Sequence, residues 1–269
     1  MKKQHFKNAH SSMSYTITLP LAFSEIGEKD RQEDALFPHP AEVTAQQPVL
    51  VLCDGLGGRA HGEQASQCVA NVVGNATIRH IPCTTQQMEL HFNQALNAAT
   101  KALNRLDAAS SEADYASPMG TTLTFLAHCT DGMLLAHLGD SRIYQFRPNQ
   151  GVIFQTYDHS LVNEYLASGK ITQAEVSTFP QRNVMTRAVM ARRVHPMQPT
   201  YNVITDVQPG DVFMMCCDGV TEQLSNTDLE RILLNKQPLA NRLDALRQCC
   251  AERHTRDNYT CWLFEVATG

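Results

Sequence analysis

The middle of the chain most constrains the fold, because it carries four consecutive strand-like segments separated by short turns. They span residues 121–128, 133–138, 142–146 and 152–155. Asp131-Gly132 follows the first segment, and Pro-Asn-Gln-Gly at 148–151 precedes the last. Both are turn sequences typical of hairpins, so this region predicts strands paired by short connections rather than through helices.

Helix candidates come in consecutive pairs on either side of this region. Apolar residues at helical spacing, such as Ala65, Val69 and Val72, predict helices at 62–79 and 85–109. A second pair is predicted at 226–235 and 238–253, and further strands at 15–19, 49–53, 201–206, 211–217 and 259–266. Hairpins combined with consecutive helices predict an α+β layered domain and argue against a doubly wound parallel sheet. We expect one domain over 15–269, preceded by a polar tail at 1–14.

Composition narrows the class of protein. Of 269 residues, 43% are hydrophobic, which allows a sizeable core. The net charge of −5 argues against a nucleic-acid binder. The longest strongly apolar run, 49–53, is too short to span a membrane, and no apolar stretch follows the basic N-terminus as in a secretory signal. Nine cysteines without a Cys-x-x-Cys motif favour reduced thiols in a cytoplasmic protein.

Acidic residues recur at the ends of apolar strands. Segment 49–53 leads into Asp54-Gly55, and segment 212–217 leads into Asp218-Gly219. Asp140 lies at a turn between two predicted strands, Asp257 lies just before the last strand, and Glu33-Asp34 follow a short basic stretch. Any one of them is typical of a turn, but several converging at one sheet edge would need cations to offset their charge. Because all these ligands are oxygens, they suit Mg²⁺ or Mn²⁺ better than zinc or copper.

Two cysteines stand directly before these acids. Neighbouring side chains in a strand point to opposite faces, so we expect Cys53 and Cys217 to face the core rather than the metal. Cys53 and Arg59 also fit Cys-x5-Arg, the phosphate loop of cysteine phosphatases. In that alternative, Asp54 would raise the pKa of the thiol, which is the wrong direction for a nucleophile.

Eight short motifs occur in one order over roughly residues 20–267. They are Gln32-Glu33-Asp34-Ala35, Asp54-Gly-Leu-Gly-Gly58 with Gly62-Glu-Gln-Ala-Ser66, Gly120-Thr-Thr-Leu123, Leu138-Gly-Asp-Ser-Arg142, Asp158-His-Ser-Leu-Val162, Arg182-Asn-Val-Met-Thr-Arg187, Cys217-Asp-Gly-Val220 and Asp257-Asn258-x-Thr260. Together they resemble the metal-dependent protein phosphatase family (PPM, or type 2C) in its bacterial form. The resemblance implies a four-layer α-β-β-α sandwich, with two central antiparallel sheets flanked by antiparallel helix pairs. It also implies a dinuclear metal centre at one end and a flap at 159–190.

By position, the resemblance implies the ligands of two metal ions. Asp54 resembles the carboxylate that bridges both, and the Gly55 carbonyl resembles a ligand of the second. Asp218 and Asp257 resemble ligands of the first metal, and Glu33 resembles a group that acts on the second through water. The metals expected are Mn²⁺ or Mg²⁺.

Three further acids also match family positions. Asp34 resembles the outer acid beside the attacking water, so the predicted catalytic acids are Asp34, Asp54 and Asp218. Asp140 resembles the ligand of a third, weaker metal, and Glu222 falls in the shell of that metal. Two metals can lower the pKa of a bridging water toward neutrality and neutralise the phosphoryl oxygens.

The sequence departs from the family at two places. Leu56 stands where eukaryotic members carry a His, so metal-bound water is expected to protonate the leaving group instead. Lys29 stands where members have the Arg that holds the substrate phosphate, and Arg31 follows two residues later. If the chain is extended there, both side chains point to one face, so either could bind phosphate.

The expected function is a Mn²⁺/Mg²⁺-dependent phosphatase that hydrolyses phosphoserine and phosphothreonine in proteins by metal-activated water. The resemblance suggests that it opposes a bacterial Ser/Thr kinase. A catalytically silent phosphatase-like binding module is the alternative from another class, against which the full acid set argues. We expect a cytoplasmic monomer that binds neither nucleic acid nor membrane.

Overall fold

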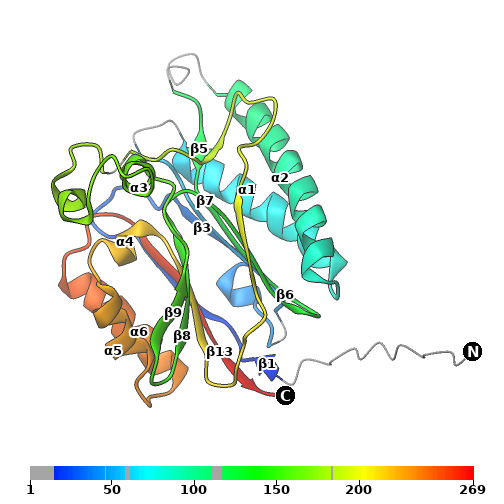
Figure 1. Cartoon of the computed structure of the whole chain (residues 1–269). Helices are drawn as coiled ribbons and strands as arrows, with labels where there is room; N and C mark the ends of the chain where they lie inside the picture. The colour runs from blue at the N-terminus through cyan, green and yellow to red at the C-terminus, as the bar shows by residue number, and fades with distance from the viewer. Residues whose placement is uncertain (1–14, 46, 58–60, 111–116, 183) are drawn as a thin grey trace, which may run out of the picture.

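Two antiparallel β-sheets packed face to face form the centre of the molecule, and helices cover both outer faces (Figure 1). The computed structural model describes residues 15–45, 47–57, 61–110, 117–182 and 184–269. The predicted tail at 1–14 and Arg59 of the Cys-x5-Arg alternative lie outside the described residues. The α+β four-layer architecture is confirmed.

The first sheet is built around the last strand of the chain. Its strand order is β1-β13-β12-β8-β9, and β2 also pairs with β13. The bounds are β1 Tyr15–Ile17, β2 Leu21–Glu25, β8 Arg142–Arg147, β9 Gly151–Gln155, β12 Val212–Cys216 and β13 Tyr259–Thr268. Because β2 and β1 both pair with β13, they together form one edge of this sheet.

The second sheet contains the strand that ends in Asp54. Its order is β11-β7-β6-β4-β3, with bounds β3 Asp34–Phe37, β4 Val49–Asp54, β6 Leu123–Cys129, β7 Gly132–Leu138 and β11 Thr200–Ile204. The predicted hairpins β6–β7 and β8–β9 are confirmed. A short ladder of β5 (Gly120–Thr121) and β10 (Val189–Met190) lies apart from both sheets.

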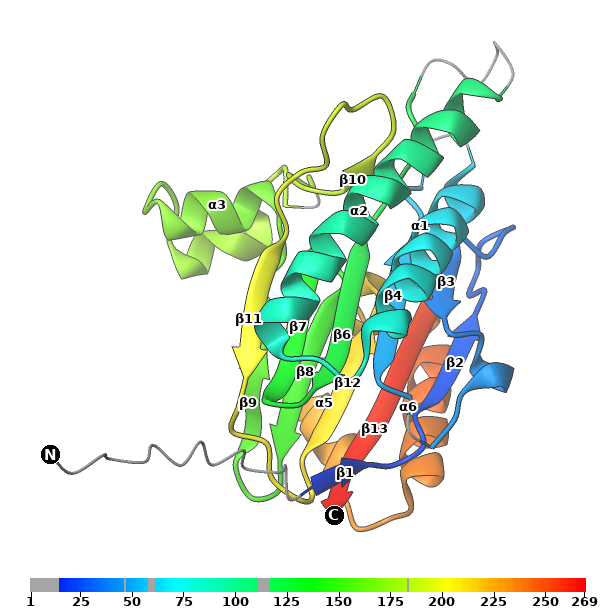
Figure 2. The same ribbon diagram turned by 90° about the vertical axis from the view of Figure 1, so that its right-hand side faces the viewer.

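One helix pair covers each sheet. Helices α1 (Gly62–Thr77) and α2 (Thr85–Ala108) lie across the second sheet, as Figure 2 shows, and bury their apolar faces against it. A capping box of Thr84 and Gln87 starts α2. Helices α5 (Asn226–Leu233) and α6 (Leu239–Glu252) pack on the first sheet. Within the described part of the chain, no helix is long and apolar enough to cross a membrane.

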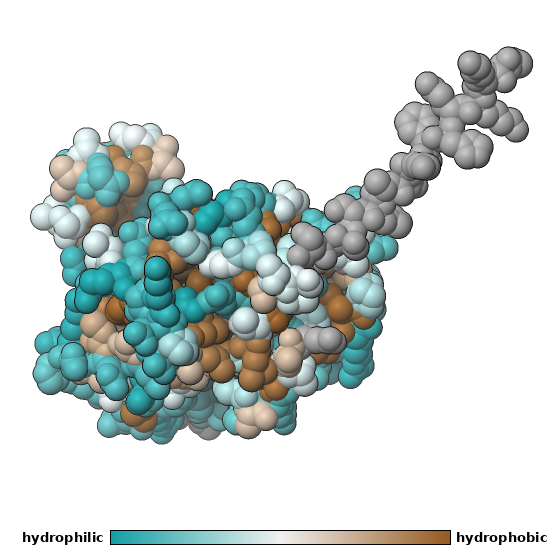
Figure 3. All heavy atoms as spheres, turned by 90° about the horizontal axis from the view of Figure 1, so that it is seen from below, coloured by the Kyte–Doolittle hydropathy of each residue, from teal (hydrophilic) through white to brown (hydrophobic). Residues whose placement is uncertain are grey.

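The side chains between the two sheets form a third apolar cluster. Trp262 of β13 is fully buried there, and its indole N–H donates a hydrogen bond of 3.2 Å to the Val51 carbonyl of β4. This bond joins the two sheets directly. At the end of the sandwich viewed from below, Figure 3 shows hydrophobic residues among hydrophilic ones.

The segment predicted as a flap contains little regular structure. It holds α3 (Leu161–Ala167) and a 3-10 helix at Gln173–Thr178, and it returns to the body through β10. The Thr186 N–H donates to the His159 carbonyl at 2.8 Å, so the two ends of the segment are tied together. A short α4 (Asp218–Thr221) follows β12.

Candidate metal centre

Strands β3 and β4 bring two carboxylates together at one end of the second sheet. Asp54 is the last residue of β4 and Asp34 the first of β3, and the antiparallel register places them directly opposite each other. A carboxylate oxygen of each and the Cys217 sulfur all lie within 4.8 Å of one another. Burial raises the pKa of both acids; the charge of Asp257 adds to the shift at Asp34, and that of Asp34 to the shift at Asp54.

The glycine turn after β4 brings Glu33 to the start of α1. The Gly55 N–H donates to the Glu33 carbonyl at 3.0 Å. A side chain at Gly55 would collide with the Gly62 carbonyl, and one at Gly62 would collide with the Glu33 carboxylate. Only glycine permits this close approach, which explains the Asp-Gly sequence at the end of an apolar strand.

The remaining predicted acids come from the first sheet and the connections beside it. Asp218 begins α4 immediately after β12, and Asp257 lies just before β13. Asp140 lies in the turn between β7 and β8. Burial, followed by the charges of Asp140, Glu222 and Asp257, raises the pKa of Asp218 to about 8. Acids from both sheets therefore act on one another across the end of the sandwich.

Asp140 has a raised pKa for similar reasons. Burial is the largest cause, the charge of Asp158 adds to it, and the pKa reaches about 6. Arg142, the nearest candidate partner in sequence, instead binds Asp158 through two bonds of 2.6 and 2.7 Å. The guanidinium of Arg142 is therefore bonded to Asp158 rather than to Asp140.

Two threonines fix the position of Asp54, and sequence reasoning assigned them no role. The Thr122 hydroxyl accepts from the Asp54 N–H at 2.9 Å, and the Thr122 N–H donates to the Asp54 carbonyl at 2.8 Å. The Thr121 hydroxyl donates to the same carbonyl at 2.8 Å. Thr122 also contacts the Ser141 hydroxyl at 2.9 Å, which links Asp54 to the turn that carries Asp140. The Thr-Thr pair in the Gly120 motif was the available signal.

Asn258 holds the loop that carries Glu33, another role missed in the sequence. Its side-chain oxygen accepts from the Glu33 N–H at 2.8 Å. Its amide group donates to the carbonyls of Ile26 and Arg31 at 2.8 and 2.9 Å. One buried carboxamide thus satisfies three backbone groups and connects β13 to the loop before β3.

The two candidate phosphate-binding residues have different surroundings. Lys29 forms an ion pair of 2.9 Å with Asp257, so it lies at the rim of the acid cluster. The Arg31 side chain is 70% exposed, and its nearest acid, Glu63, is 3.9 Å away. The chain bends at 29–31 rather than running extended, so the condition for a shared face is not met.

Both cysteines lie in the core, as the sequence predicts, but Cys217 also borders the acid cluster. Cys53 lies in the core between the second sheet and α1. Cys217 is buried but sits beside Asp34 and Asp54. Strand alternation continues to Cys217, because it packs with Phe213 and Met215 between the sheets, whereas Cys216 packs under the helices. Its thiol donates to the Asn258 carbonyl at 3.4 Å.

The cysteine-phosphatase alternative does not fit this geometry. The Cys53 side chain is fully buried, and its pKa is raised well above its usual value. Burial is the main cause, and the charges of Asp54 and Asp34 add to it. A buried, protonated thiol cannot attack a phosphate.

The acid cluster has the chemistry of a divalent-cation site. Neither carboxylate oxygen of the buried Asp34 has a hydrogen-bond partner in the part of the chain that the structure describes. Burial first, and then the charges of neighbouring carboxylates, raise the pKa values of Asp54 and Asp218. Divalent cations bound by oxygen would offset both costs, so the residues fit the metals expected from the sequence.

A four-layer sandwich that gathers carboxylates from both sheets at one end has the residues to hold a pair of divalent cations, which would supply an activated water. The chain belongs to the protein phosphatase 2C family, whose model matches residues 24–264. It is therefore a metal-dependent protein phosphatase, as the order of its motifs indicates. The silent-module alternative is not favoured.

Known proteins with related sequences support this membership. Protein phosphatase PhpP of Streptococcus pneumoniae is 27% identical over 243 residues, which cover 90% of this chain and 95% of that protein. Serine/threonine phosphatase stp of Listeria monocytogenes is 28% identical over 220 residues, covering 81% and 84% of the two chains.

Solved structures agree with the same fold. Serine/threonine phosphatase Stp1 of Staphylococcus aureus superimposes with a TM-score of 0.79 at 26% identity, covering 98% of this chain and 99% of that one. The catalytic domain of the serine/threonine phosphatase PstP, solved in complex with two manganese ions, gives a TM-score of 0.74 at 25% identity and covers 93% and 99%.

Proposed function

We propose that the acid cluster holds two divalent cations, Mn²⁺ or Mg²⁺, and that the chain uses them to hydrolyse phosphoserine and phosphothreonine in proteins. Asp54 would contact both ions, and Asp218 and Asp257 would bind the first. The Gly55 carbonyl and Glu33 would bind the second, Glu33 through water. When bound, such a pair of cations supplies an activated water and neutralises charge on the phosphoryl group.

Other residues of the chain would position the metal ligands, take up a proton and bind the substrate phosphate. Thr121, Thr122 and Asn258 hold Asp54 and Glu33 in place through the bonds described above. We assign proton uptake to Asp34, because it pairs with Asp54 in the strand register and its carboxylate lies within 4.8 Å of that of Asp54. Lys29, at the rim of the cluster, is placed to bind the substrate phosphate.

A third cation would bind at Asp140, with Glu222 in its shell. In support, the charges of both residues raise the pKa of Asp218, and that of Glu222 raises the pKa of Asp140, so the three acids lie near one another. Asp140→Ala should leave two ions bound per chain while turnover slows. Isothermal titration with Mn²⁺ measures the number of ions, and a variant that binds none would contradict the assignment.

The proposed phosphatase activity suggests a physiological role. Relatives named as serine/threonine phosphatases support phosphoproteins as substrates, and we propose that the enzyme opposes a bacterial Ser/Thr kinase. We further propose that it works in the cytoplasm as a monomer. A phosphoproteome compared with and without the gene would identify the substrates.

The observation that carries the proposal is the pair of carboxylates, buried Asp34 and half-buried Asp54, which lie opposite each other at the ends of β3 and β4. The test is hydrolysis of an aryl phosphate and of a phosphothreonine peptide with added Mn²⁺ and with excess EDTA. We expect activity only with the metal. Full activity in EDTA that is lost on thiol alkylation would refute the metal-centre reading.

A further inference from the structure

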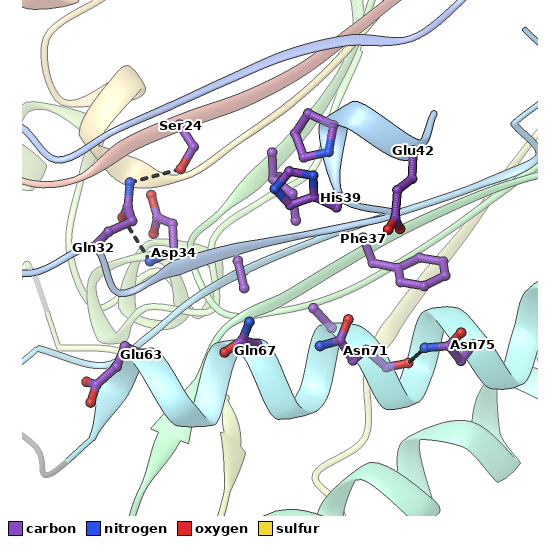
Figure 4. A pocket seen from close by; sticks show the side chains of 14 residues that line it. Ser24, Gln32, Asp34, Phe37, His39, Glu42, Glu63, Gln67, Asn71 and Asn75 are labelled. Atoms are coloured by element: carbon purple, nitrogen blue, oxygen red, sulfur yellow. Dashed lines mark hydrogen bonds between the residues drawn. The ribbon is translucent and has the colours of Figure 1, made fainter. Parts of the chain in front are cut away.

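A groove of about 750 Å³ runs along the outer edge of β3, between this strand and α1 (Figure 4). We refer to it as the β3 groove. Asp34 lies at one end, and the 3-10 turn Pro40–Glu42 lies at the other. Because Asp34 also belongs to the acid cluster, the β3 groove is continuous with the proposed metal centre.

One wall of the β3 groove is a row of polar side chains on α1. Glu63, Gln67, Asn71 and Asn75 follow one another at intervals of four residues, so they share one face of the helix, as Figure 4 shows. The three carboxamide residues are exposed. Each carboxamide offers two N–H donors and one carbonyl acceptor, the same groups that a peptide backbone presents.

The floor of the β3 groove is an open sheet edge. In the described part of the chain, β3 pairs only with β4 and ends the strand order of its sheet. The hydrogen bond from the Gly55 N–H to the Glu33 carbonyl shows that alternate residues of β3, counted from Glu33, direct their backbone groups toward β4. Leu36 therefore directs its N–H and C=O away from β4, toward the open edge. Such an edge can accept an added strand.

The charged residues that line the β3 groove are acidic. Asp34 and Glu63 lie near the metal centre, and Glu42 lies at the far end. Arg31 is 3.9 Å from Glu63 and compensates part of its charge. A basic residue on a bound peptide would therefore find its complement at Glu42.

We propose that the β3 groove binds an extended segment of the phosphoprotein substrate, adjacent in sequence to the phosphorylated residue, as a strand added to β3. A basic residue of that segment reaches Glu42. The proposal rests on the phosphatase function proposed above. The helix rises about 18 Å from Glu63 to Asn75, and an extended chain rises about 3.3 Å per residue, so the β3 groove holds about five residues.

The test uses phosphothreonine peptides of two lengths. The short peptide has one residue on each side of the phosphothreonine, and long peptides add about five residues, including a terminal Arg, on one side or the other. We expect one long peptide to have a kcat/KM about tenfold above that of the short one. In the triple variant Gln67→Ala, Asn71→Ala, Asn75→Ala this ratio should fall to near one, because the carboxamides are lost.

The matched control is Asn97→Ala on α2. Asn97 donates to the carbonyl four residues earlier at 2.8 Å, as Asn75 does at 2.9 Å, but it does not line the β3 groove. Alanine is the best helix former, so all these variants should fold. A charge exchange, Glu42→Lys, should reverse the preference from a terminal Arg to a terminal Glu. If the triple variant keeps the wild-type ratio, the proposal is wrong.

A binding measurement separates this proposal from the phosphatase function. Fluorescence anisotropy with a labelled long peptide, in EDTA, should give a Kd at least fivefold weaker for the triple variant than for the wild type. If the wild type fails to hydrolyse aryl phosphate with Mn²⁺, the proposed phosphatase function is wrong. The anisotropy measurement alone then decides whether the β3 groove binds the peptide. A dimer in sedimentation that dissociates in the triple variant would assign the β3 groove to a second copy and overturn the proposal.

Discussion

Asp54 and Cys53 are neighbours in the chain but face different surroundings. The carboxylate of Asp54 joins the acid cluster, whereas the thiol of Cys53 packs in the core under α1. We expect Asp54→Ala to lower kcat/KM by more than about 100-fold, because it removes the group proposed to contact both metals. Cys53→Ser should keep most of the activity. Circular dichroism checks the fold of each variant, and an inactive, well-folded Cys53→Ser enzyme would count against the metal mechanism.

Lys29 and Arg31 make a second test at the scale of single residues. The pKa of Lys29 is raised, chiefly by its hydrogen bond to Asp257, so the amine stays charged at neutral pH. A charge-assisted bond to phosphate is worth about 1.5–3 kcal/mol, so Lys29→Ala should lower kcat/KM for a phosphopeptide by about 10- to 100-fold. Arg31→Ala should change it by less than about threefold. The reverse order would assign the phosphate to Arg31.

At the scale of elements, one side chain holds the loop between β2 and β3. Asn258 makes three hydrogen bonds to that loop, at 2.8 to 2.9 Å. Asn258→Ala would leave these backbone groups without their partner, at a cost of about 2–4 kcal/mol in the free energy of unfolding. It should also weaken Mn²⁺ binding about 10- to 100-fold through Glu33. Urea unfolding and metal titration measure the two effects.

Asn258→Asp is the control for this prediction. It keeps the oxygen that accepts from the Glu33 N–H but loses the two N–H groups that donate to Ile26 and Arg31. We expect a loss of stability at least as large as that of Asn258→Ala, because a carboxylate oxygen would then face two carbonyl oxygens. Equal stability of the wild type and both variants would show that the loop does not depend on Asn258.

The four long helices and most of the strands could be predicted from sequence, but two strands of the central sheets could not. Helices α1, α2, α5 and α6 end within two or three residues of their predicted bounds, because apolar periodicity over many residues is a strong signal. Strands β2 and β3 were not predicted. Neither contains a β-branched residue, and each contains an acid, Glu25 in β2 and Asp34 in β3.

The acids of the site were predicted from the sequence, but the contacts that hold these acids in place were not. Asp54 and Asp218 stand out because an apolar strand leads into each. That Asp34 lies directly opposite Asp54 depends on a strand register that no local pattern encodes. The bonds of Asn258 to residues more than 200 positions earlier depend on the tertiary fold in the same way.

At the scale of the whole molecule, the acid cluster makes stability depend on pH and metal together. An acid whose pKa is raised on folding binds protons more tightly in the folded state. Its contribution to stability is therefore present below its unfolded pKa and is lost as pH rises through its folded pKa. Burial raises the pKa of Asp218 from 3.8 to about 8 and that of Asp140 to about 6, so the metal-free protein should lose stability between about pH 4 and pH 8.

Bound cations keep the carboxylates deprotonated and should remove this loss. The difference in Tm between the Mn²⁺ form and the EDTA form should therefore widen from pH 5 to pH 8, as measured by scanning calorimetry. The double variant Asp54→Asn, Asp218→Asn should show little widening. A Tm difference that is the same at both pH values in the wild type would contradict the prediction.

The bond between Trp262 and Val51 makes the tryptophan an intrinsic fluorescence probe of the contact between the two sheets. Trp262 is the single tryptophan of the chain, and it spans the space between the two sheets. Its emission wavelength therefore reports whether the sheets are in contact or have let water in. Asp54 belongs to one sheet, and Asp218 follows a strand of the other. The contact between the sheets that determines the emission wavelength therefore also determines the distance between these acids. The emission of Trp262 and the spacing of the acids therefore both depend on the contact between the two sheets.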